Sequence, residues 1–136
     1  MNHTKKLLLA LAFISFAFSC KKSENNNCGT SHLGGFISSN ATIYTSKDKG
    51  WGKLTLQELY YYKDDGTKYE GSIWYGTIDR YFNAEPECEA QGTIYFSVNP
   101  GQKAEYKLIA DDGKIYEGWI RASCEGGCQF QDIAQY

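Results

Sequence analysis

The residues of this sequence with the clearest chemistry are its five cysteines, Cys20, Cys28, Cys88, Cys124 and Cys128. A thiol can bind a metal, act as a nucleophile or form a disulfide, depending on its neighbours and on the redox compartment. Three residues separate Cys124 from Cys128, a spacing that fits a zinc site, but no histidine lies near them. In a small exported domain, the four cysteines after Cys20 instead favour two disulfides. We therefore expect disulfides, no metal site and no cofactor.

Residues for acid, base or nucleophilic catalysis are scarce. The two histidines are His3, at the start of the chain, and His32. Ser31 precedes His32, but a catalytic serine and histidine must be positioned across a fold by a third group. We expect no catalytic residues, and the chain is predicted not to be an enzyme.

Acidic residues gather in three places: 64–65, 111–112 and 85–89. The first two resemble pieces of a calcium loop, but the required spacing of oxygen ligands is missing. Both are followed by glycine, which is typical of tight turns. The third group is interpreted as a solvated loop beside a disulfide.

Aromatic side chains are abundant, with 11 tyrosines, 3 tryptophans and 7 phenylalanines. Neighbouring aromatics in a strand point to opposite faces, so some must lie outside the main core. One interpretation is aromatic pairing across a solvated sheet, which stabilises the fold. The other is a ligand-binding surface formed by Trp51, Trp74, Tyr75 and Trp119, because exposed rings stack on sugars or partner proteins.

The elements that must position these residues are strands. Segments rich in β-branched and aromatic residues alternate with turn formers, which predicts about seven strands and no long helix. In 93–98 and 104–110 apolar and polar residues alternate, as expected of half-buried strands. The expected strands are 42–45, 54–62, 69–75, 93–98, 104–110, 115–122 and 129–133.

A leader precedes these strands. Lys5 and Lys6 come before an apolar run over 7–18, which is too short to span a bilayer and is typical of a signal peptide. The run ends in Ala17-Phe18-Ser19-Cys20, which resembles a bacterial lipobox, where a small residue precedes the cysteine that becomes the lipidated N-terminus. The resemblance implies a leader over 1–19 and lipid, such as palmitate, on Cys20. Ordinary secretory cleavage nearby remains the alternative.

The segment after Cys20 is polar and predicts a tether over 20–35, followed by a single domain over 36–136. Lys21 follows the cysteine, and the resemblance to lipoproteins then implies anchoring to the outer membrane, on either its periplasmic or its surface face. Without Lys5 and Lys6, the chain has 12 basic and 16 acidic residues. No nucleic acid partner is expected, because phosphates require a basic excess.

The later part of the chain carries a second resemblance. Residues 92–101, with their strand and Pro100-Gly101 turn, and the strand that starts at Tyr106 resemble small prealbumin-like β-sandwiches related to carboxypeptidase regulatory domains. Together with the strand pattern, this favours an all-β, antiparallel sandwich. Glu87-Cys88 and Gly126-Gly127-Cys128 extend the likeness to small envelope lipoproteins, in which these two cysteines pair. That resemblance implies a Cys88–Cys128 disulfide, which leaves Cys28 for Cys124.

Two functions remain open. The first is a lipid-anchored, non-catalytic binding or accessory module for a glycan or an envelope protein. The second is an envelope hydrolase, or an inhibitor of an envelope enzyme, that uses the acidic residues of segment 77–91.

Overall fold

The computed structural model describes Cys28, residues 39–73 and residues 75–136. The leader, Cys20 and most of the predicted tether lie outside these residues. Within the described part the chain is almost entirely β, which confirms the predicted all-β class. No helix there is long and apolar enough to cross a membrane. The described strands are β1 (Ser39–Tyr44), β2 (Leu54–Tyr62), β3 (Lys68–Glu70), β4 (Tyr75–Ile78), β5 (Ile94–Val98), β6 (Lys103–Ala110), β7 (Ile115–Arg121) and β8 (Gly127–Asp132), followed by the 3-10 helix η1 (Ile133–Gln135).

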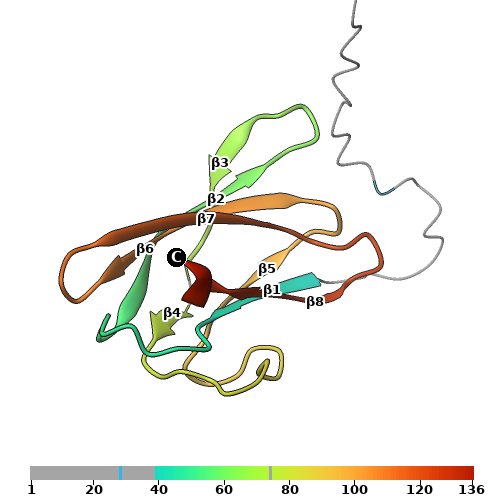
Figure 1. The fold of residues 1–136 in the computed structure, drawn as a ribbon. Coiled ribbons are helices and arrows are strands. Elements are labelled where there is room, and N and C mark those ends of the chain that lie inside the picture. Colours follow the sequence, from blue (N-terminus) through green and yellow to red (C-terminus); the bar gives the residue numbers. More distant parts are fainter. Residues whose placement is uncertain (1–27, 29–38, 74) are drawn as a thin grey trace, which may run out of the picture.

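These strands form one connected sheet in the order β7-β6-β2-β4-β5-β1-β8, with β3 paired to β2 (Figure 1). All pairs are antiparallel except β1 with β8, which is parallel. The prediction of a wholly antiparallel sheet is therefore wrong. The strand that follows β7 is β8, which does not pair with β7 but with β1 at the other end of the sheet. The sequence could not predict this, because alternation specifies which faces of a strand are buried and not which strands lie beside it.

The sequence also predicted seven strands, and the extra one comes from segment 69–75. It divides into β3 and β4, which both pair with the same edge of β2, at opposite ends. Gly71 lies at the break, where its N–H donates to the Leu59 carbonyl at 2.7 Å. A Cβ at Gly71 would collide with the Tyr61 ring. This close packing requires a glycine and interrupts the expected strand.

The sheet curls, so both halves contribute inward side chains to one core. From one half come Leu59 of β2 and Leu108 of β6, and from the other come Ile43 of β1 and Ile94 of β5, all fully buried. Ile94 and Leu108 lie on the apolar side of an alternating strand, as the sequence pattern predicts for β5 and β6. Ile133 of η1 is also fully buried in this core.

The two Asp-Gly pairs form turns, as predicted. Asp65 Oδ1 accepts a hydrogen bond from the Thr67 N–H at 2.8 Å, in the β2–β3 connection. Gly66 has a φ of 82°, which a residue with a side chain rarely adopts. The β6–β7 turn repeats this arrangement with Asp112 and Gly113.

Two disulfides fasten the connections, and they join the cysteines in the predicted pairs, Cys28–Cys124 and Cys88–Cys128. The second lies against the outer side of β1, where Thr42 Oγ1 is 3.2 Å from Cys128 Sγ. It holds the long β4–β5 connection to β8. The first attaches Cys28, within the predicted tether, to the turn after β7.

Candidate functional site

Of the four aromatic residues predicted to form a binding surface, Trp51 and Trp119 are described, and these two are not brought together. Trp51 is 7% exposed and packs edge-on against Tyr116, with ring centroids 5.4 Å apart. It is a core residue, because the β1–β2 loop that carries it folds over the end of the core. Trp119 of β7 is 57% exposed and points to the opposite side of the sheet. Trp74 and the side chain of Tyr75 lie outside the described residues.

The surroundings of Trp119 form a continuous surface on the outer side of β3, β2, β6 and β7. In β6, Lys103, Glu105 and Lys107 alternate with buried residues and point outward. The strand register places Glu105 between Tyr60 of β2 and Trp119 of β7. We call this surface the aromatic face, and it comprises Tyr60, Tyr62, Lys68, Lys103, Glu105, Lys107, Glu117 and Trp119.

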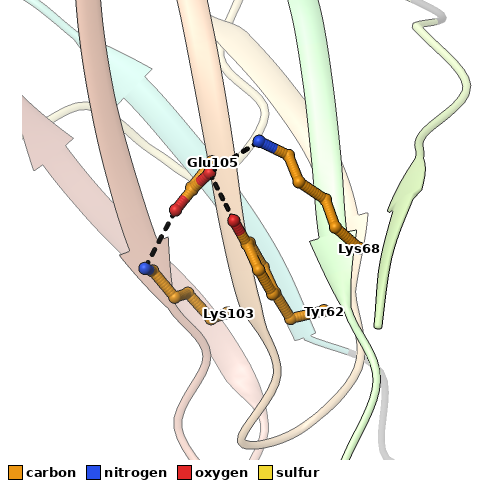
Figure 2. A network of polar contacts seen from close by, with 4 residues as sticks. All are labelled: Tyr62, Lys68, Lys103 and Glu105. Carbon is orange, nitrogen blue, oxygen red and sulfur yellow. Dashed lines mark hydrogen bonds and ion pairs between the residues drawn. The ribbon is translucent and has the colours of Figure 1, made fainter. Parts of the chain in front are cut away.

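Glu105 is the centre of a polar network on this face (Figure 2). One carboxylate oxygen, Oε2, accepts hydrogen bonds from the Tyr62 hydroxyl at 2.6 Å and from Lys68 Nζ at 3.0 Å. The other, Oε1, accepts one from Lys103 Nζ at 3.0 Å. Three strands therefore hold one carboxylate in a fixed orientation.

The electrostatics agree with this geometry. The Tyr62 hydroxyl, and after it the two lysines, lower the pKa of Glu105 to about 2 against the opposing effect of burial. The hydrogen bond from Lys68 to this carboxylate raises the pKa of Lys68. Both groups are therefore charged at neutral pH.

A hollow of about 350 Å³ lies over this surface, between Trp119 and Tyr60. Lys103 Nζ is 5.5 Å from the centroid of the Trp119 ring, and Lys68 Nζ is 4.2 Å from that of Tyr60. A separate ion pair, Lys107 Nζ with Glu58 Oε1 at 2.9 Å, borders the hollow. The arrangement combines an exposed indole with ordered hydrogen-bonding groups, which can stack on a flat ring and bind its substituents.

The acidic residues of segment 77–91 do not form a metal site, since no group of three potential metal-binding side chains occurs among the described residues. Glu89 accepts a hydrogen bond from the Asn40 amide. Asp79 Oδ1 forms an ion pair with Nε of the next residue, Arg80, at 3.6 Å. Glu85 and Glu87 are exposed, in agreement with a solvated loop.

Trp119 was predicted from the sequence as a binding residue, but the residues around it were not. The charges at 105 and 107, which alternate with apolar residues in the predicted strand 104–110, already indicate a charged outer face. They do not reveal that Tyr62 and Lys68 reach Glu105, because that contact depends on the pairing of three strands. Comparison with known proteins adds no relative: no family model, no curated protein and no solved structure matches this chain.

Proposed function

We propose that this protein is a lipid-anchored module of the bacterial cell envelope that binds a glycan, without catalysis, on its aromatic face. The leader and Cys20 support the anchor, because a lipidated cysteine next to a polar tether holds a small domain at a membrane surface. Outer-membrane placement is part of the same proposal. The partners are thus the membrane, through lipid on Cys20, and an envelope glycan.

The observation that carries the glycan proposal is the exposed indole of Trp119 next to the fixed carboxylate of Glu105. Sugar rings present an apolar face that stacks on an aromatic side chain and an edge of hydroxyl groups that donate to carboxylates. Because the network already orients Glu105, little conformational entropy is lost when a ligand binds.

A protein partner fits this surface less well. The centres of protein–protein interfaces are depleted in lysine and glutamate, whereas those residues surround Trp119. Removing several ion-paired groups from water over a wide area is costly. A sugar would cover only the indole and its nearest hydrogen-bonding groups.

We further propose that the curled sheet is a variant of the prealbumin-like sandwich. Its support is that β6 and β2 on one side and β5 and β1 on the other share a single core. The parallel β1–β8 pair would be this chain's departure from that pattern.

The proposal is tested by measuring binding of the purified chain to an array of envelope glycans, including peptidoglycan fragments and lipopolysaccharide oligosaccharides. Trp119→Ala is expected to abolish the binding of whichever glycan the wild type retains. Ile115→Ala is the matched control, because Ile115 is 53% exposed on the same side of β7 and lies outside the hollow. No binding to any glycan, with capture of one envelope protein that depends on Trp119, would contradict the glycan proposal.

A further inference from the structure

The aromatic face carries its charges unevenly along β6. The strand register places Lys107 of β6 between Glu58 of β2 and Glu117 of β7, so two carboxylates flank one ammonium group at this end of the face. At the other end, two lysines share the carboxylate of Glu105 (Figure 2). Counting these groups, the net charge is negative at the Lys107 end and positive at the Glu105 end.

Glu117 is the acidic group of the negative end that remains available to a ligand. Lys107 Nζ donates to Glu58 Oε1 at 2.9 Å, whereas Glu117 is exposed and has no hydrogen bond or ion pair with any described residue. The hydrogen bond to Glu58 and, to a smaller extent, the more distant charge of Glu117 raise the pKa of Lys107. A positively charged group of a ligand can therefore approach Glu117 without breaking an existing pair.

The exposed indole of Trp119 lies beside this carboxylate. Glu117 and Trp119 both point outward from β7 and are two residues apart, which puts their Cα atoms roughly 7 Å from each other. Glu117 lines the hollow and Lys103 does not, so the hollow lies on the Glu117 side of the indole. The faces of indole rings attract cations and stack on sugar rings.

From this arrangement we infer that the glycan of the aromatic face contains an amino sugar with a free, positively charged amino group. The inference rests on the proposed glycan binding and specifies its ligand. The sugar ring stacks on Trp119, its ammonium group donates to the Glu117 carboxylate, and its hydroxyl groups reach Glu105. An N-acetylated sugar fits less well, because acetylation removes the charge and adds a carbonyl, which accepts hydrogen bonds as Glu117 does.

The test uses two oligosaccharides of equal length, one of glucosamine and one of N-acetylglucosamine, each titrated into the purified chain by calorimetry. The glucosamine oligomer should bind at least about fivefold more tightly, because only its ammonium groups pair with Glu117. A higher salt concentration should reduce this ratio, since an exposed charge pair is screened.

Variants of the chain locate the contact. Glu117→Gln should weaken binding of the glucosamine oligomer at least about fivefold and leave binding of the acetylated one unchanged. Glu125→Gln, which alters an exposed carboxylate outside the hollow, is the matched control and should change neither affinity. Trp119→Ala should abolish the binding of both oligomers, since both stack on the indole.

The outcomes separate this inference from the proposed function. Trp119-dependent binding of acetylated or neutral glycans, with equal or weaker binding of the glucosamine oligomer, would overturn the inference and leave glycan binding intact. A preference for glucosamine that persists in Glu117→Gln would also overturn it, as would equal binding of a lysine oligomer, which has the charge without the sugar ring. No binding of any glycan would overturn both.

Discussion

At the residue scale, Glu105 shows how register turns ordinary surface residues into an organised group. Its partners Tyr62, Lys68 and Lys103 come from three strands, and none of them is distinguishable in the sequence from an ordinary surface residue. Single exposed ion pairs contribute little to stability, but a network with one shared carboxylate contributes more. The same network fixes the group that we propose contacts a sugar.

Glu105 should contribute to stability in a defined range of pH. Its pKa is about 2 in the folded protein, below the ordinary value of 4.5 expected in the unfolded chain. A lowered folded-state pKa stabilises the fold above the unfolded pKa, and the contribution is lost as pH falls from about 4.5 to about 2. Because the side chain is 29% exposed, we expect about 1–2 kcal/mol after solvent screening.

Urea unfolding of Glu105→Gln and the wild type checks this prediction. Their difference in unfolding free energy should be present at neutral pH and should shrink as the pH approaches 2. The exposed Glu125→Gln variant is the control and should match the wild type throughout. A Glu105→Gln difference that stays constant over this range would show that the charge of Glu105 is not the cause.

At the scale of elements, the two turns were predicted by their Asp-Gly pairs, and the inward faces of β5 and β6 by alternation. It could not predict the division of segment 69–75, because that depends on the contact of Gly71 with the Tyr61 ring. It could not reveal the burial of Trp51 either, since that residue lies in a loop without periodicity. Long-range contacts decide both features.

The disulfides hold elements that local sequence leaves unconnected. Cys28–Cys124 spans 96 residues and Cys88–Cys128 spans 40. In the chain-entropy model, loops of these lengths predict stabilisation of roughly 4–5 and about 4 kcal/mol. Replacing both cysteines of one pair by serine should lower the unfolding free energy by about these amounts, measured by urea denaturation.

Peptide mapping without reduction is the companion measurement. It should recover Cys28 linked to Cys124 and Cys88 linked to Cys128. A peptide with Cys124 bonded to Cys128 would refute the pairing. Losses below 1 kcal/mol for both double variants would show that the chain-entropy model fails here.

At the scale of the whole molecule, the all-β class followed from composition and turn spacing, but the parallel contact of the first and last strands did not. β1 and β8, which pair in parallel, are the first and the last described strands. No local pattern records such a pairing, because a strand can bury the same face beside several neighbours.

The proposed membrane anchor also belongs to the scale of the whole molecule. In cells fed an alkyne fatty acid, we expect the wild-type protein to be labelled and to sediment with membranes. Cys20→Ser should lose the label and be released or mislocalised, because residues 21–27, which follow the cysteine, include no apolar residue to replace the lipid. An unlabelled wild-type protein with its mature N-terminus elsewhere would rule out lipid on Cys20.

Whether the aromatic face holds a glycan is tested most directly by amide chemical-shift mapping with the strongest glycan from the array. We expect shifts at Tyr60, Glu105 and Trp119 that saturate together and disappear in Trp119→Ala. Shifts confined to residues outside the aromatic face, or saturating shifts that persist in Trp119→Ala, would contradict glycan binding there.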